Sequence, residues 1–268
     1  MLSNEVTMVT CFFDINRGSK GDGRTIDEYK EWIKKTLQLN CNLYIITEVK
    51  LYDFFIEFRP KHYNTVIKVI EFNDLHYNKY YDRIKNIIEC DYYKNKIAYP
   101  NRVECKLPEY NIIQYSKFHC LQMAIDENPF KSNYFFWMDA GVSRFFLDVD
   151  ISKQYPSNNC IDFLKNEDNE NKFIIQNRHD LNNYIIDEDF IWKADNLLIG
   201  TMFGGSIKII QEISKLLEDT FVNKMLNNTN ANNEQLALAI VWKERPSLFH
   251  LLNNNSNNHL IIFKMLSL

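Results

Sequence analysis

The stretch FFWMDAGVSRF, residues 135–145, places an acid at the end of the most hydrophobic strand that the sequence predicts. The run YFFWM at 134–138 has no polar face, which is typical of a strand buried on both sides of a sheet. Asp139 follows this run, and the small residues Ala140 and Gly141 come next. Because open α/β sheets bind ligands beyond the carboxyl ends of their strands, we expect Asp139 to meet a ligand there.

Two other predicted strands also end in acids. VTMVTCFFD at 6–14 ends at Asp14, and NLYIITE at 42–48 ends at Glu48. A single acid in this position is often only a turn-forming or capping residue. Three acids at one edge of a sheet, two of them beside glycine-containing turns, favour a functional site at that edge.

Predicted helices alternate with predicted strands along the chain. Helices are expected at 26–39, 80–88, 112–127, 207–224 and 233–243, further strands at 65–72, 173–176, 196–202 and, in HLIIFK, 259–264, and 51–58 is helical or extended. This order predicts an α/β fold with a mostly parallel sheet and helices on both faces. With no internal repeat and no clear linker, residues 1–268 are expected to form a single domain.

Composition excludes several classes of protein. The chain has 268 residues, 46% of them hydrophobic, and a net charge of −4, which argues against nucleic-acid binding by bulk electrostatics. No apolar run reaches the roughly 18 residues of a membrane helix, and the first residues lack the features of a secretory signal. The six cysteines have no metal-binding spacing and fit buried reduced thiols. We therefore expect a cytoplasmic protein without a membrane span.

The seven glycines gather in three places, which marks where the backbone needs special freedom. One group lies in the basic loop INRGSKGDGR at 15–24, and Gly141 follows Asp139. The third group, in GTMFGGS at 200–206, includes Gly204 and Gly205 before a predicted helix. Amides exposed at such a helix start can hold an anion or a sugar hydroxyl, although neither a Walker loop nor GxGxxG is present.

Two weaker metal signals remain. The sequence Asp148-Val149-Asp150 is a literal DxD, but this motif is frequent by chance, and Asp139 is the stronger metal candidate. All six histidines are isolated, and His250 is the one that could bring a late ligand to the site. Signatures of serine hydrolases, zinc proteases and kinases do not occur in the sequence.

Four blocks in order, VTCFFDINRG, NPFKSNYFFWMDAGVSRF, DNLLIGTMFGGS and NNEQLALA, resemble the HtrL/YibB family. Its members are bacterial and viral proteins assigned to nucleotide-sugar-dependent glycosyltransferases of the GT-A type. The resemblance implies a GT-A-like, Rossmann-related fold. In it, residues 1–140 would mainly bind the nucleotide and 141–268 the acceptor. Abundant Asn, Ile, Lys and Tyr are typical of AT-rich genomes, such as those of some protists, bacteria or giant viruses.

The resemblance also implies a donor site for a UDP-sugar. Thr10, Phe12 and Asp14 would surround the uracil and the ribose. Basic contacts to the diphosphate or donor sugar would come from the side chains of Arg17, Arg24 and Lys117, with a solvated helix position as the alternative for Lys117. The segment containing Gly204 and Gly205 would shape the donor-sugar pocket.

Metal binding follows the same resemblance with one departure. Asp139 occupies the place of the first acid of the GT-A DxD, where it would touch the ribose and Mn²⁺. Gly141 stands where the second acid would be, and a single carboxylate binds a hard cation poorly. The diphosphate, water or His250 would have to supply the remaining ligands.

The resemblance implies transfer of a hexose to a hydroxyl of a glycan or a glycosylated protein, with collagen-like proteins among the acceptors to test. Glu234, at the start of a predicted helix, would be the general base, and Asp195 competes for this role. Two alternatives stay open. One is a catalytically inactive protein that binds sugar nucleotides, and the other is a nucleotidyltransferase using Asp148 and Asp150.

Overall fold

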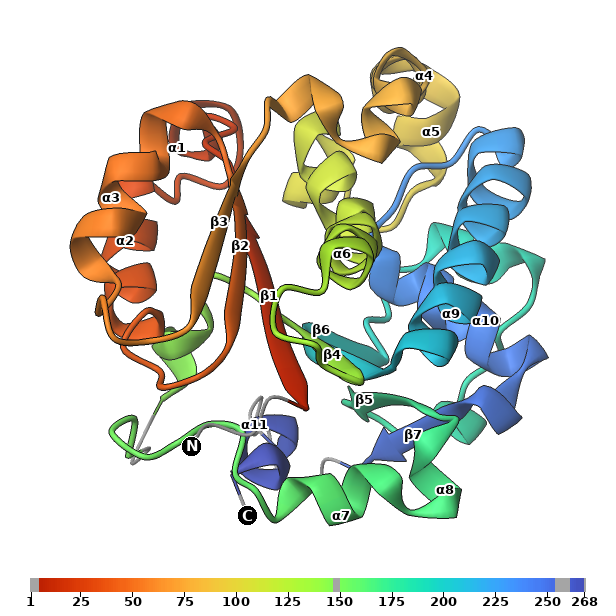
Figure 1. Cartoon of the computed structure of the whole chain (residues 1–268). Helices are drawn as coiled ribbons and strands as arrows, with labels where there is room; N and C mark the ends of the chain where they lie inside the picture. Colours follow the sequence, from red (N-terminus) through yellow and green to blue (C-terminus); the bar gives the residue numbers. More distant parts are fainter. Residues whose placement is uncertain (1–4, 147–149, 254–260, 268) are drawn as a thin grey trace.

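The computed structural model, which describes residues 5–146, 150–253 and 261–267, contains a seven-stranded sheet (Figure 1). Its strands are β1 (Val6–Phe12), β2 (Leu43–Thr47), β3 (Thr65–Val69), β4 (Tyr134–Met138), β5 (Phe173–Asn177), β6 (Leu198–Ser206) and β7 (Phe249–Leu252). The strand order is β3-β2-β1-β4-β6-β5-β7. Only β6 runs antiparallel to its two neighbours among these strands. The predicted α/β class with a mostly parallel sheet is therefore confirmed.

Side chains of one strand point alternately to the two sides of the sheet, so each face carries its own apolar core. Helices cover both faces. In β1, Val9 and Cys11 join one apolar core, and Met8 and Phe12 join the other. The first core is covered by α4 (Tyr81–Glu89), α5 (Asp91–Lys96), α6 (Pro108–Glu127), α9 (Ile207–Asp219) and α10 (Glu234–Glu244). The second is covered by α2 (Ile26–Thr36), α3 (Tyr52–Phe58), α7 (Cys160–Lys165) and α11 (Ile261–Leu266). Two short helices are α1 (Arg17–Lys20) and α8 (Glu167–Glu170).

Local signals explain the bounds of the helices near the site. Thr25 caps α2 in a capping box, in which its hydroxyl accepts from the Glu28 amide and the Glu28 carboxylate accepts from the Thr25 amide. Pro108 occupies the first turn of α6, where its missing N–H costs nothing. The same helix ends at Asn128 in the left-handed conformation, just before Pro129, as the sequence predicts.

Two elements at the end of the chain differ from the prediction. Residues 261–264 of the expected strand at 259–264 lie in α11, whose Ile262 and Phe263 are buried against the second core. The strand β7 was not predicted. Both segments are short apolar runs, whose periodicity does not separate a strand from a buried helix.

Within the described ranges, no helix is both long and apolar enough to cross a bilayer. All six cysteines are unpaired, and five of them are buried. This agrees with the expectation of buried thiols.

Candidate active site

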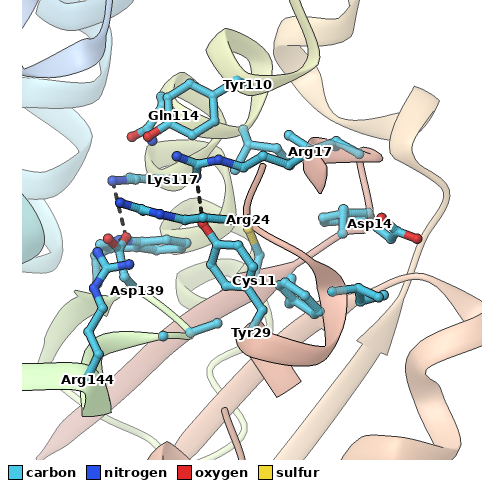
Figure 2. A pocket seen from close by; sticks show the side chains of 18 residues that line it. Cys11, Asp14, Arg17, Arg24, Tyr29, Tyr110, Gln114, Lys117, Asp139 and Arg144 are labelled. Carbon is cyan, nitrogen blue, oxygen red and sulfur yellow. Dashed lines mark hydrogen bonds and ion pairs between the residues drawn. The ribbon is translucent and has the colours of Figure 1, made fainter. Parts of the chain in front are cut away.

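Two adjoining cavities lie beyond the carboxyl ends of β1 and β4, the edge where the sequence predicts a ligand. The smaller has a volume of about 130 Å³ and the larger about 420 Å³. Lys117, Asp139 and Arg144 line both cavities, so the two form one continuous site. Figure 2 shows these three side chains grouped together at one side of the smaller cavity.

The smaller cavity is mainly apolar. Its hydrophobic lining consists of Cys11, Phe12, Phe13, Ile15, Ile26, Tyr29, Ile113 and Trp137. Asp14 also lines it, but Figure 2 shows its carboxylate pointing away from the other labelled side chains. Its side chain pairs with Lys50 at 3.4 Å, and its backbone amide donates to Glu48 at 2.6 Å. The cavity therefore suits a flat, weakly polar group such as a nucleobase.

The larger cavity is polar and rich in positive charge. Together the two cavities are lined by six cationic side chains: Arg17, Arg24, Arg102, Lys117, Arg144 and Arg178. Four acids accompany them: Asp14, Asp22, Glu104 and Asp139. An excess of cations is unusual here, because the chain as a whole carries a net charge of −4. The site therefore favours an anionic ligand.

Arg17 is fixed where the two cavities meet. Its guanidinium donates two bonds of 2.7 Å to Asp22 and one of 2.6 Å to the Tyr29 hydroxyl, and it lies 4.6 Å from the centre of the Tyr110 ring. Burial alone would lower the pKa of Arg17, but the bonds to Asp22 and the nearby tyrosines outweigh it, and the net shift is upward. Arg24 lies 3.6 Å from the same Asp22 carboxylate. Both predicted arginines thus face the site.

Lys117 forms the centre of a buried charge cluster. Its ammonium lies 2.8 Å from Glu234 Oε1 and 3.2 Å from Asp139 Oδ1, and it donates to the Gly200 carbonyl at 2.9 Å. Burial lowers the pKa of Lys117, but the Asp139 and Glu234 carboxylates together raise it above its ordinary value. Lys117 is therefore a permanent cation and is no solvated helix position, since its side chain is only 4% exposed.

Asp139 enters the larger cavity from the end of β4. Its side chain is 28% exposed, and its Oδ1 accepts a bond of 2.8 Å from Trp137 Nε1. The backbone amide of Asp139 donates to the Thr201 carbonyl, which fixes the acid beside β6. A Cβ on the nearby Gly141 would lie 3.1 Å from the Trp32 ring, which is a tight contact.

Glu234 does not line either cavity. It is fully buried at the start of α10, behind Lys117, and a Cβ on Gly200 would collide with its Oε1. Burial raises the pKa of the Glu234 carboxyl above its ordinary value, although the Lys117 ammonium opposes this shift. A general base must reach the proton that it removes, so this position suits a residue that holds Lys117. Asp195 is half-buried beside Asn196, which does line the larger cavity.

Four other predicted residues lie away from the cavities. Thr10 is buried inside β1, and its hydroxyl has no hydrogen-bond partner among the described residues. Gly204 and Gly205 lie at the far end of β6, paired with the beginning of β4, because β6 runs antiparallel. Glycine is required there by packing, since a Cβ on Gly204 would lie 2.6 Å from the Phe136 ring. His250, on the edge strand β7, packs against Phe163.

The residues of the site do not fit a divalent cation. Mn²⁺ and similar ions need several oxygen ligands at near-octahedral geometry. No group of three or more His, Cys, Asp or Glu side chains in the described ranges could hold a metal ion. Asp139 Oδ1 already contacts Trp137 and Lys117, and His250 is three strands away from β4 in the sheet order. Asp148 and Val149 of the DxD lie outside the described residues, and Asp150 is exposed.

The structure adds site residues that sequence reasoning missed. Tyr110 lies four residues before Gln114, and Gln114 lies three residues before Lys117. This spacing puts all three side chains on one face of α6. That spacing could have identified Tyr110 and Gln114 from the sequence. Arg102 and Arg178 come from a loop near residue 103 and from the end of β5, and no local pattern marks them.

The strand order, the single antiparallel strand and the cavity at the carboxyl ends define a doubly wound α/β protein that fits a GT-A-like fold. The chain belongs to the HtrL/YibB family. The model of this family, described as a bacterial protein of unknown function, matches residues 4–265. The family recognised from the four sequence blocks is thereby confirmed.

One solved structure with a similar fold is the apo form of mouse xyloside xylosyltransferase 1. The two chains have 10% sequence identity and a TM-score of 0.45, over 92% of this chain and 85% of that chain. No curated protein sequence matches the chain.

Proposed function

We propose that this chain is a glycosyltransferase that moves a hexose from a UDP-sugar to a hydroxyl of a glycan or a glycosylated protein. The observation that carries the proposal is the two-part site, in which an apolar cavity adjoins a cationic one at the carboxyl ends of β1 and β4. A sugar nucleotide has the same order of parts, with a flat base, a doubly charged diphosphate and a polar sugar.

The parts of the donor can be assigned to the two cavities. The uracil and ribose would lie against Phe12 and Tyr29 in the smaller cavity. The diphosphate would pass Arg17 and Arg24 where the cavities join and reach Arg144 and Arg178 in the larger cavity. The sugar would extend into the larger cavity, whose lining includes the amide side chains of Asn101, Gln114, Asn196 and Gln235. Amides of this kind can donate to and accept from sugar hydroxyls. In this assignment the first 140 residues mainly bind the nucleotide, and the later ones mainly bind the sugar and the acceptor.

The chemistry follows from the charges. The bond between the anomeric carbon and the diphosphate breaks, the diphosphate gains negative charge, and the acceptor oxygen bonds to the same carbon. Preorganised cations at the leaving group lower the barrier of such a transfer. No step in this proposal uses Mn²⁺, because the described residues do not form its ligand set.

We assign the role of the base that removes the acceptor proton to Asp195, in preference to Glu234. All four acids that line the cavities are paired with a basic side chain. Asp195 has no ion-pair partner among the described residues, and its neighbour Asn196 lines the larger cavity. Glu234 then acts as a positioning residue, which holds the Lys117 ammonium at Asp139.

One observation favours a second function. Neither carboxylate that could act as a base lines a cavity, since Glu234 is buried and Asp195 is only adjacent to the lining. A protein that binds a sugar nucleotide without transferring the sugar would have such a site. The nucleotidyltransferase alternative has no comparable support within the described residues.

A panel of UDP-sugars and GDP-sugars tests the proposal. A ligand that binds the folded state raises the melting temperature according to its concentration relative to Kd. We expect UDP and UDP-hexoses to raise the melting temperature and a suitable glycan acceptor to cause release of UDP. Stabilisation without UDP release in a broad acceptor screen, collagen-like glycoproteins included, would favour the binding protein. No stabilisation by any nucleotide sugar would refute the proposal.

A further inference from the structure

We infer that the departing diphosphate is neutralised by two of the chain's own cations, Arg144 and Arg178, and that Lys117 occupies the place where a divalent metal ion would otherwise act. This inference rests on the proposed function and specifies how the same site works. It predicts that donor binding and transfer do not depend on a metal ion.

The first support is that a cation already stands beside Asp139. The Lys117 ammonium is 3.2 Å from Asp139 Oδ1, on the acid that would be expected to bind a metal. A dication on this oxygen would be repelled by the ammonium and would compete with the bond from Trp137 Nε1. Asp139 therefore binds the Lys117 ammonium in place of a metal ion.

The second support is that Lys117 is not able to move aside. Its ammonium is 2.8 Å from Glu234 Oε1, and Glu234 is fully buried. Removing the lysine would leave a buried carboxylate without a counter-charge, which is strongly unfavourable. The Gly200 carbonyl holds the same ammonium through a bond of 2.9 Å. The position is occupied by a fixed positive charge before any ligand arrives.

The third support comes from two arginines in the larger cavity. Arg17 and Arg24 share Asp22, and Arg102 pairs with Glu104. In contrast, Arg144 and Arg178 have no carboxylate partner within the part of the chain that the structure describes, and Arg144 lies against the rings of Trp32 and Phe145. Burial without an anion lowers the pKa of Arg178, whose Nε is buried and has no partner among the described residues.

These two side chains suit the diphosphate because a guanidinium presents several N–H donors in a planar fork that matches phosphate oxygens. Arg144 follows β4 and Arg178 follows β5, and both side chains line the same cavity of about 420 Å³. A diphosphate between them would supply the anion that both lack. Its charge would then be balanced by the two guanidinium groups.

Calorimetric titration of the full chain with UDP, once in excess EDTA and once in excess MnCl2, tests the inference. We expect the two Kd values to agree within about twofold. Arg144→Met and Arg178→Met should each weaken UDP binding by at least about tenfold in EDTA, because each removes charged hydrogen bonds to phosphate. Binding of uridine, which lacks the phosphates, should stay unchanged. Arg83→Met is the matched control, because Arg83 bonds to Asn227 and lines neither cavity.

The outcomes separate this inference from the proposed function. If UDP binds at least about tenfold more tightly with Mn²⁺ than in EDTA, the inference is wrong while the proposed function stands. Wild-type affinity for UDP in both arginine variants would also overturn it. If UDP binds under neither condition, the proposed function fails and the inference fails with it.

Discussion

Replacement of Lys117 by methionine removes the cation from a buried cluster and should destabilise the fold strongly. Lys117 is 4% exposed, and it contacts two carboxylates and the Gly200 carbonyl. Methionine fills a similar volume, but it leaves the fully buried Glu234 without its counter-charge. Breaking a buried pair in this way typically costs about 3–5 kcal/mol, and we expect a loss of this size at neutral pH.

The loss of stability in Lys117→Met should depend on pH, and the direction of this dependence follows from the pKa of Glu234. Burial raises the pKa of this carboxyl above its ordinary value, while Lys117 opposes the shift. An acid with a raised pKa in the folded state binds its proton more tightly there, so its favourable contribution is present at low pH and is lost as pH rises. Without Lys117 the pKa should rise further. Protonation of Glu234 should therefore relieve part of the damage in acid, by about 1.4 kcal/mol for each pH unit within this window.

Urea unfolding followed by circular dichroism, at about pH 5 and about pH 8, measures both effects. The control is Lys50→Met, because Lys50 is 52% exposed and pairs with Asp14 and Glu48. This exposed pair should contribute less than about 1 kcal/mol. The double variant Lys117→Met with Glu234→Gln should regain much of the stability at about pH 8. A loss in Lys117→Met that equals the control, or that is the same at both pH values, would refute the reasoning.

Three further predictions concern single side chains. Asp139→Ala should lower the unfolding midpoint, because it removes a partner of Lys117 and of Trp137, while the fold stays intact and UDP release falls by at least about a hundredfold; normal release would remove Asp139 from the site. Asp195→Asn should slow transfer by about 10²–10⁴-fold with the Kd for UDP unchanged, and equal rates in a steady-state assay would exclude it as the base. Gly204→Ala should cost about 1–3 kcal/mol in thermal unfolding, because its Cβ would collide with the Phe135 carbonyl and the Phe136 ring; an unchanged melting temperature would show that β6 can shift.

Placement of residues from the sequence was most specific where the signal is local. The apolar run before Asp139 identified a buried strand, and its acid lies in the cavity. The basic loop after β1 was expected to face the ligand, and Arg17 and Arg24 line both cavities. In each case a strand end and the loop after it determine where the side chain emerges.

Other expectations depended on how distant elements pair. Gly204 and Gly205 were placed near the ligand because a glycine turn before a helix often binds anions. β6 runs antiparallel to β4, so this turn lies at the opposite edge of the sheet. His250 was a candidate ligand, but β7 pairs at the outer side of β5, away from Asp139. The direction and order of strands are set by long-range contacts, which no local pattern contains.

The amino-acid sequence by itself determined the α/β class, the family and the edge of the sheet where a ligand is expected, because apolar runs and terminal acids are local properties of the chain. Only the tertiary structure decided which charges meet. It brought Lys117 of α6 between Asp139, which follows β4, and Glu234 of α10, and Lys117 and Glu234 are 117 positions apart. Because these three side chains meet in a buried place, Lys117 is a cation held in one position. The charge of the site therefore depends on how distant elements pack together.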